Sequence, residues 1–311
     1  MTHRPLLIAL LLLLYGARPV AQSGSEPVRE VVTKTIEDSY PYRNGTELAV
    51  EGEKAEIFVE TWDRDRVSVR VVMTARHAKL ETARAELDNL ELVTELGGPK
   101  IFIRNRRRDP DHRSESELSV HYYITLPEAC PVYLRSHFGG ATISNLRNQL
   151  RINGEFSAIN IDNVQGLLDI RTRFGDVTGE RIDGNVVINA RRSDISLFDV
   201  GGTFTINAKY GKLNLSPNAG MRNLQVNADK SDVTIYEPAG GEGLAYELAA
   251  TNGNLNLPDN RRFRILERTE ERRRVQIGSA SERMGTVTAS VTFGDLTLSR
   301  QRRELESRSR F

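Results

Sequence analysis

The sequence has few of the residues from which catalytic and metal sites are built, with one cysteine and five histidines among 311 residues. The single cysteine, Cys130, excludes an internal disulfide and a cysteine-based zinc site. The histidines lack metal-ligand spacing, and no serine–histidine–aspartate order, phosphate-binding loop or dinucleotide fingerprint is present. We therefore predict no catalytic residue, no metal site and no cofactor, and we expect that the protein is not an enzyme.

The sequence also lacks an excess of charge of either sign. It has 43 basic and 42 acidic side chains, and removal of residues 1–21 takes away Arg4 and Arg18 and no acid, which leaves 41 against 42. A dedicated nucleic-acid-binding protein usually has a strong basic bias. We therefore exclude nucleic acid as a partner.

Long apolar runs are absent beyond the first residues, so no transmembrane segment is predicted in the mature chain. The apolar run Leu6–Leu14 follows the basic Arg4 and is too short to span a membrane. Small residues after it suit cleavage by signal peptidase, after Ala21 or alternatively after Ala17. Residues 1–21 are thus predicted to be a signal peptide, and the protein to be exported to the periplasm, the cell surface or outside the cell.

What the sequence does contain is a repeat of about 18 residues. Each copy has two runs of alternating apolar residues, the pattern of strands with one buried face, and a small residue lies between the runs where the chain turns. The copies begin at Leu48, Val132, Leu150, Leu168, Val186, Phe204, Leu224, Tyr246 and Val287. The third inward position of the first run is small in the central copies: Ser136, Gly154, Thr172, Ala190, Ala208, Ala228 and Ala250.

No single copy can bury its own apolar face, whereas stacked copies bury it jointly. We therefore predict an all-β fold, a single-stranded parallel β-helix or β-solenoid with coils of about 18 residues, right-handed by the general crossover preference. A β-sandwich is the alternative. A β-sandwich would not place the same kind of side chain at the same inward position at a fixed interval.

The repeat divides the chain into four predicted parts. These are the signal peptide (1–21), an N-terminal decorated part of the solenoid (22–130), the regular coils (131–299) and a charged tail (300–311). The decorated part is expected to contain one short helix within residues 77–90, further strands at 67–71, 101–103 and 120–126, and a charged loop at 104–117. A second insertion covers residues 259–286.

Several local motifs resemble a known family. They are the opening segment Glu56–Asp63 followed by residues 67–69, the strand end Ile124–Pro127, and the turns Phe174–Val177 and Phe293–Leu296. They resemble the putative-adhesin β-helix domains of bacterial envelope and secreted proteins, over nearly the whole mature chain. The resemblance implies an extracytoplasmic right-handed β-helix with no established enzyme activity. The adhesin label in that family rests on fold analogy.

Four acidic residues, Asp176, Asp194, Asp232 and Asp295, occupy the same turn position in different copies. Stacked carboxylates can bind calcium or act as a general acid–base pair. However, aspartate after a tight turn usually bonds the backbone, and calcium solenoids have a denser repeat. We favour turn capping.

Phe138, Phe156, Phe174 and Tyr210 share the position before that turn. Strand alternation places them inward, so we predict an aromatic ladder in the core. An exposed strip that stacks on sugars is the alternative.

Two outward columns are the candidate binding surfaces. Arg173, Arg191 and Lys209 form a basic stripe between Glu155 and Asp229, suited to anionic glycans or phospholipid headgroups, although a solvated face is the default interpretation. The second column is uncharged and consists of Asn160, Thr178, Ser196, Asn214, Thr234 and Asn256. We favour a structural role for it, in side-chain hydrogen bonding between coils, over recognition of a repetitive glycan.

These features favour an adhesin-like binding scaffold at the cell envelope, with a glycan or a surface protein as partner. The alternative is a structural envelope protein that self-associates through its sheet edges. A polysaccharide-acting enzyme is a third hypothesis, with Asp176 and Asp194 as its only candidate residues.

Overall fold

The computed structural model describes residues 29–238, 243–259, 261–278 and 285–300. The predicted signal peptide and tail residues 301–311 lie outside the described residues. Within them the chain is nearly all strand, which confirms the predicted all-β class. The helix is α1 (Leu80–Asp88), and the strands are β1 (Glu30–Pro41), β2 (Glu47–Glu53), β3 (Ala55–Trp62), β4 (Arg66–His77), β5 (Leu90–Gly97), β6 (Lys100–Arg107), β7 (Glu117–Pro127), β8 (Val132–Ser144), β9 (Leu150–Arg173), β10 (Val177–Arg191), β11 (Ile195–Lys209), β12 (Lys212–Asp229), β13 (Asp232–Tyr236), β14 (Leu244–Thr251), β15 (Leu255–Asn256), β16 (Arg264–Arg268), β17 (Arg272–Ile277), β18 (Gly285–Thr292) and β19 (Leu296–Ser299).

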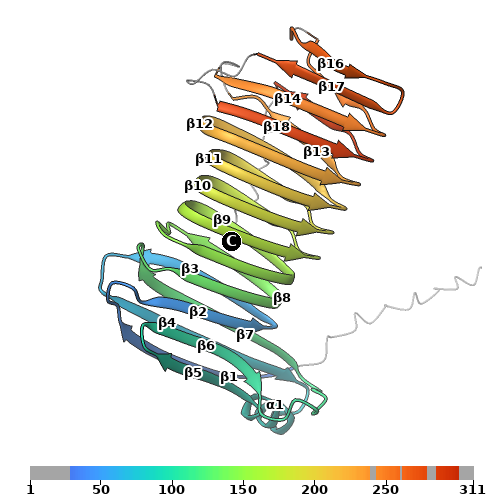
Figure 1. The fold of residues 1–311 in the computed structure, drawn as a ribbon. Helices are drawn as coiled ribbons and strands as arrows, with labels where there is room; N and C mark the ends of the chain where they lie inside the picture. Colours follow the sequence, from blue (N-terminus) through green and yellow to red (C-terminus); the bar gives the residue numbers. More distant parts are fainter. Residues whose placement is uncertain (1–28, 239–242, 260, 279–284, 301–311) are drawn as a thin grey trace, which may run out of the picture.

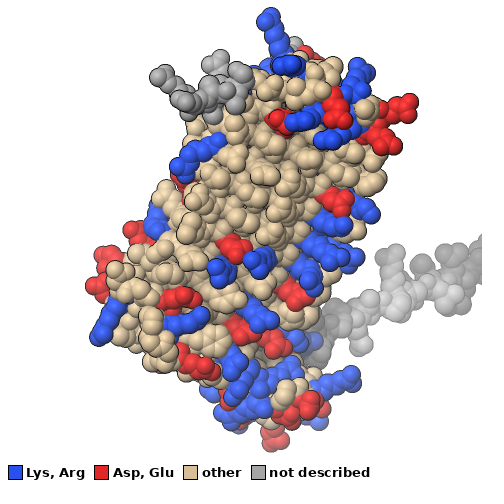
Figure 2. Space-filling model, viewed as in Figure 1, with Lys and Arg blue, Asp and Glu red and all other residues tan. Residues whose placement is uncertain are grey.

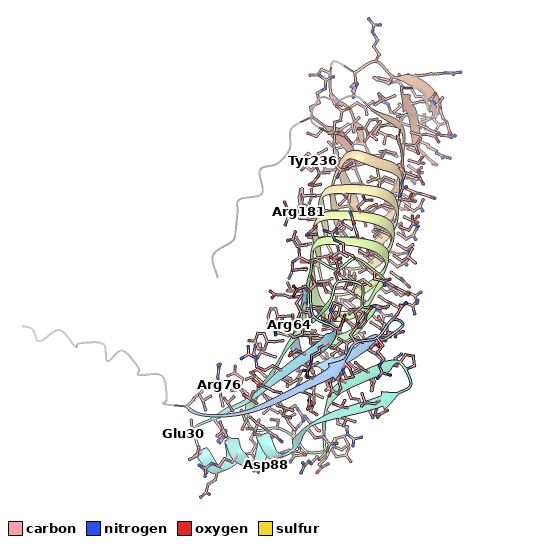
Figure 3. The ribbon with its side chains drawn as sticks, turned by 90° about the vertical axis from the view of Figure 1, so that its left-hand side faces the viewer. Glu30, Arg64, Arg76, Asp88, Arg181 and Tyr236 are labelled. Atoms are coloured by element: carbon pink, nitrogen blue, oxygen red, sulfur yellow. The ribbon has the colours of Figure 1, made fainter. Side chains whose placement is uncertain are left out.

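The long strands β8 to β12 lie one above another and pair in parallel (Figure 1). Val177 is paired with Ile159 on one side and with Ile195 on the other, an offset of 18 residues each way. Equivalent positions of successive sequence copies therefore lie directly above one another in the stack. Figure 3 shows the same coils from the side, with Arg181 and Tyr236 on one flank of the stack. Handedness stays a prediction.

Inward apolar side chains fill the centre of the stack. Ile188, Ile206 and Val226, from three successive coils, are fully buried. They belong to one continuous core that runs from the first coil to the last. Because each coil contributes only one layer of side chains, the core is stable only as a stack.

Each coil turns at a residue with a left-handed backbone conformation. Phe156 has a φ of 52° and Phe174 a φ of 57°, and the same conformation recurs in the coils above and below. The next residue approaches the neighbouring coil closely. A Cβ atom on Gly175 would lie 2.1 Å from the carbonyl oxygen of Ser157, and one on Gly211 2.1 Å from that of Ser193. Gly175 and Gly211 leave no room for a side chain, whereas the same position holds Ser157 or Ser193 in the neighbouring coils. Glycine and serine thus alternate at this corner from coil to coil.

The order of coils in space differs from their order in the sequence at both ends. Strands β2 and β3 pair in parallel with β8 on one side and with β6 and β7 on the other. The first copy thus lies against the copy at Val132, and the chain between them forms a further coil outside. At the other end β18 lies between β12 and β14, so the last copy in sequence is the penultimate one in space.

Antiparallel strands cover the two end coils. Strand β4 pairs with β7 and β1, β5 pairs with β6, and β17 pairs with β14 and β16. Helix α1 packs against β1 and β4 at one end of the stack (Figure 1). The sequence predicted α1, β4, β6 and β7 but not β1, β5 or the β16–β17 hairpin. The loop predicted at 104–117 is shorter than expected, because β6 continues to Arg107. No helix in the described residues is long and apolar enough to cross a membrane.

Candidate binding groove

A groove of about 770 Å³ crosses the coils on the face formed by β9 to β12 and β18. Two outward columns of side chains line it. We name the first the amide column: Asn153, Arg171, Asn189, Asn207, Asn227 and Ser290. We name the second the charged column: Glu155, Arg173, Arg191, Lys209, Asp229 and Thr292. Small inward residues separate the two columns, and because they hold the strands close to the coil axis, the face is hollowed between them.

Figure 2 shows this face. A broad uncharged area lies over β10 to β12, and basic and acidic side chains gather along its right-hand edge. The hollow is therefore polar in its middle and charged along one side.

The charged column is paired at both ends and open in its centre. Glu155 lies 3.5 Å from Arg173, and Asp229 lies 2.7 Å from Lys209. The hydrogen bond that Lys209 donates to Asp229, followed by the negative charge of Asp229, raises the pKa of Lys209. Arg191 lies between the two pairs, in register with both Arg173 and Lys209, and makes no ion pair within the described chain. The stripe predicted from the sequence is thus a row of three cations of which only the central one is free.

The amide column contains a ladder of hydrogen bonds between coils. The Asn207 side-chain amide donates to the Asn189 carbonyl at 3.1 Å, and Asn227 donates to Asn207 at 3.0 Å. Each amide has two donors and two acceptor lone pairs, so further bonds to a ligand remain open. The ladder fixes the orientation of the three side chains while leaving hydrogen-bonding capacity towards the groove.

The uncharged column of the sequence analysis lies outside the groove, on the other side of the corner. Its members Asn160, Thr178, Ser196, Asn214 and Thr234 are in register from coil to coil. In the described part of the chain no hydrogen bond joins these five side chains. Only at the end of the column does Asn256 donate to Thr297, at 3.3 Å. The nine residues of the two predicted columns are therefore divided between two faces, with Arg173, Arg191 and Lys209 in the groove.

The aromatic side chains at the corner are exposed, so the prediction of a core ladder was wrong. Phe138, Phe156 and Phe174 are between 37% and 47% exposed, and Tyr210 is 36% exposed. The left-handed corner is the cause. It adds one outward residue to the strand alternation, so that Ser157 rather than Phe156 takes the buried position. Together with Arg192, Lys230 and Phe293 these residues form what we call the corner row.

The faces of the rings in the corner row are already in contact. Phe156 stacks on Phe138 at 4.9 Å and on Phe174 at 4.7 Å. The guanidinium of Arg192 lies 5.3 Å from the Phe174 ring centroid and 5.8 Å from that of Tyr210. The Phe156, Phe174 and Tyr210 rings thus each have two neighbours in the row, with Lys230 beside Tyr210. Sugars stack on free ring faces, so these three rings do not form the alternative sugar-stacking strip.

The acidic turn positions bond the backbone of the next coil. The Asp176 carboxylate accepts the backbone N–H of Asp194 at 2.9 Å, and Asp194 accepts that of Lys212 at 2.8 Å. Asp232 accepts the N–H of Asp295 at 3.0 Å. The aspartates do bond backbone N–H groups, but the prediction that they cap their own turn was wrong, because each partner lies one coil away. No group of metal-binding residues is present in the part of the chain that the structure describes.

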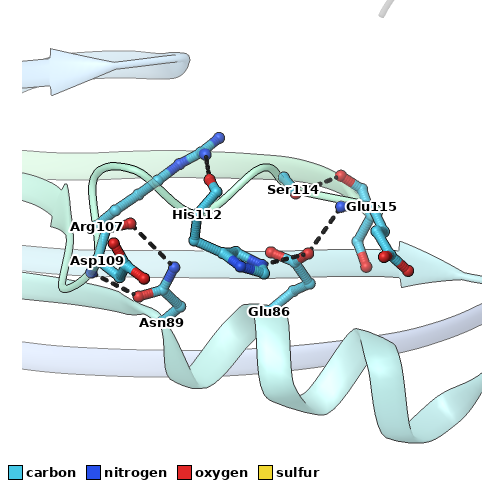
Figure 4. A network of polar contacts seen from close by, with 8 residues as sticks. Glu86, Asn89, Arg107, Asp109, His112, Ser114 and Glu115 are labelled. Atoms are coloured by element: carbon cyan, nitrogen blue, oxygen red, sulfur yellow. Dashed lines mark hydrogen bonds and ion pairs between the residues drawn. The ribbon is translucent and has the colours of Figure 1, made fainter.

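A second hollow, of about 520 Å³, lies beside α1 at the N-terminal end. Figure 4 shows the polar network at its base. The buried Glu86 carboxylate bonds the His112 ring at 3.0 Å and accepts the backbone N–H of Glu115 at 2.7 Å. Asn89 accepts the N–H of Asp109 at 2.9 Å. Burial opposes ionisation of Glu86, but the hydrogen bonds it accepts outweigh burial and lower its pKa. The network ties the loop between β6 and β7 to the helix.

A stack of coils with an open groove defines a class of all-β repeat proteins that present an extended surface. Within this class, the chain belongs to the Toastrack DUF4097 family, which it matches over residues 45–299.

Similar solved structures include a protein described as a putative adhesin from Bacteroides fragilis NCTC 9343, with a TM-score of 0.44 and 11% identity over 88% of this chain and 100% of that chain. Another is a putative cell adhesion protein from Clostridium sporogenes ATCC 15579, with a TM-score of 0.29 and 12% identity over 86% of this chain and 99% of that one. With TM-scores below 0.5, neither carries an argument about function. No curated protein matches the chain.

Proposed function

We propose that the chain is an exported, non-catalytic β-solenoid that acts as an adhesin-like binding scaffold at the cell envelope or outside the cell. The observation that carries the proposal is the groove of about 770 Å³ across the coils. The predicted signal peptide supports export. The acids at the turn positions are engaged by backbone N–H groups, which removes the support for a polysaccharide-acting enzyme.

The construction of the groove suits an extended ligand. Parallel pairing repeats each outward position from coil to coil at a spacing of about 4.8 Å. The strands that carry the side chains are paired on both sides and pack on a buried core, so the surface is held in place before a ligand arrives. A preformed surface loses little conformational entropy on binding.

The proposal is tested with purified, tagged residues 22–311 and fractionated envelope from the source cells. We expect saturable binding, and we expect that Asn207→Trp, which places a bulky side chain in the groove, abolishes it. Asn214→Trp is the matched control, because Asn214 is also an outward asparagine but lies beyond the corner, and it should bind as the wild type does. Absence of saturable binding, or equal loss in both variants, contradicts the proposal.

A second candidate function is self-association, and one observation favours it. Strand β1 has 12 residues and pairs only with β4 in the described chain, so its other edge is open. An open edge can pair with a second copy. Sedimentation velocity over a wide concentration range tests this candidate. A species that grows with concentration supports it, and a monomer throughout contradicts it.

A further inference from the structure

The groove carries a net positive charge that is concentrated at one side chain. Four basic and two acidic side chains line the groove, a net charge of +2. Arg173 and Lys209 are paired within the charged column, and Arg171 lies 3.5 Å from Asp169. Arg191 alone among the four bases has no acidic partner in the described chain. A guanidinium has five N–H donors and binds carboxylate and phosphate groups in a two-pronged geometry.

The corner row adds to this preference for negative charge. An aromatic ring is negative over its faces and positive at its edge. In the corner row the faces of Phe156 are covered by Phe138 and Phe174, so the edges point to solvent. Arg192, the residue after Arg191, covers the next face in the row. The margin of the groove next to Arg191 is thus lined with cations and with the positive edges of rings.

From these features we infer that the groove binds an acidic linear polysaccharide that lies along the coil axis, with Arg191 holding an anionic group of the polymer. The inference rests on the proposed function and names the ligand class. The asparagine ladder supplies amide donors and acceptors at three successive coils, which match the hydroxyl groups of successive sugar units. The paired Glu155 and Asp229 close the positive stretch at either end.

Other ligand classes fit the groove less well. An extended peptide gains most of its affinity by pairing with a sheet edge, whereas the groove lies on a sheet face. A membrane surface requires exposed apolar side chains among the basic ones, and the groove lining contains no large apolar residue. A nucleic acid requires many cations along its path, and here three of the four bases are already paired.

The test is calorimetric titration of residues 22–311 with three probes. These are oligogalacturonate, the same oligomer with its carboxylates methyl-esterified, and a linear phosphorylated mannan oligomer. We expect that at least one anionic probe binds, that the esterified oligomer does not, and that affinity falls with added salt. The two anionic probes distinguish a carboxylate from a phosphate ligand.

Arg191→Gln should weaken binding about tenfold or more, since it removes a charge-assisted hydrogen-bonding group. Arg181→Gln is the matched control, because Arg181 is exposed, lies at a different corner and is paired with Asp162. Circular dichroism confirms folding of both variants. Equal binding of the esterified oligomer, or equal affinity of Arg191→Gln and wild type, overturns the inference. If the anionic probes fail while envelope material still binds in an Asn207-dependent way, the ligand class is wrong and the proposed function stands.

Discussion

Phe156 and Phe174 stack face to face across neighbouring coils, with ring centroids 4.7 Å apart and ring planes 3° apart, although both residues have a left-handed backbone. That conformation costs a residue with a side chain roughly 1–2 kcal/mol. Such strain persists only where the surroundings compensate for it. The stacked rings and the bonded backbone of the adjacent coils supply that compensation.

Replacement of Phe156 tests this balance. Phe156→Ala should lower the free energy of unfolding by about 1–2.5 kcal/mol, less than the 3–5 kcal/mol typical of a core phenylalanine, because the ring is half exposed. Phe156→Gly should be less destabilising than Phe156→Ala, since glycine adopts the left-handed conformation without strain. Urea denaturation measures both.

Phe293→Ala is the control for this pair, because Phe293 contacts only a lysine in the corner row, and we expect a loss below about 1 kcal/mol. A glycine variant less stable than the alanine variant at Phe156 would show that backbone strain is absent at the corner.

A second prediction concerns the aspartates at the turns, which bond the backbone of the next coil. Asp194→Ala removes the acceptor of the Lys212 N–H and should lower the free energy of unfolding by about 1–2 kcal/mol. Asp194→Asn keeps an acceptor oxygen and relieves repulsion from Asp176, so its cost should be about 0.5 kcal/mol or less. Thermal denaturation with and without calcium measures the effect. An equal loss in both variants, or a stabilisation by calcium that Asp194→Asn removes, contradicts this role of Asp194.

A third prediction concerns a buried carboxylate at the C-terminal end. The Glu237 side chain is 1% exposed and is bonded by Arg261 and by Arg300, the first residue of the predicted tail. Burial, together with the charge of Glu237, raises the pKa of the nearby Tyr246. Glu237→Ala removes the buried carboxylate that both guanidinium groups contact, and we expect a loss of about 2–3 kcal/mol from these charge-assisted bonds. Urea denaturation measures it.

The loss should be local as well as large. Hydrogen exchange in Glu237→Ala should increase in β14, β18 and β19 and stay unchanged in β9 to β11. Glu155→Ala is the control, because its ion pair with Arg173 is exposed and contributes less than about 1 kcal/mol. A uniform increase of hydrogen exchange along the whole stack would contradict a local role of Glu237 at the C-terminal end.

The polar network at α1 predicts a dependence on pH. Hydrogen bonds lower the pKa of Glu86 in the folded chain below its value of about 4.3 in the unfolded chain. Its contribution to stability is therefore present above about pH 4.3 and is lost as the pH falls through the folded-state pKa. Hydrogen exchange of α1 between pH 3 and 6 measures this.

In Glu86→Gln, protection of α1 should be lower than in the wild type at pH 6, and the difference between the two should shrink as the pH falls below about 4.3. An identical pH profile for variant and wild type would mean that ionisation of Glu86 does not control the contact between α1 and the loop.

The parallel register of the central coils could be predicted because each inward position recurs at a fixed interval. Ile188, Ile206 and Val226 belong to successive copies and lie in successive layers of the core. The orientation of Phe156 could not be predicted by alternation, because a left-handed residue at the corner shifts the alternation by one position. The sequence did contain a signal for the outward orientation, which is the glycine or serine that follows each aromatic residue. This small residue marks the position that is packed against the neighbouring coil, so the ring before it points outward.

The order of the end coils could not be predicted either. The copies that begin at Tyr246 and Val287 have the same pattern, so nothing local states which of them lies next to the copy at Leu224. The groove was predicted only in part. The sequence identified the charged column as a candidate binding surface, but it proposed the uncharged column that begins at Asn160 as a candidate too. Periodicity alone does not show which columns share a face.

The exchanged order of the end coils has a mechanical consequence. In a simple stack, a pull on the chain end peels the outermost coil by breaking one ladder of hydrogen bonds. Here the coil of β18 and β19, the last of the described chain, is paired with β12 and β13 on one side and with β14 and β15 on the other. A load applied beyond Ser299 must therefore rupture two ladders at once. This arrangement resists unravelling of the stack under tension.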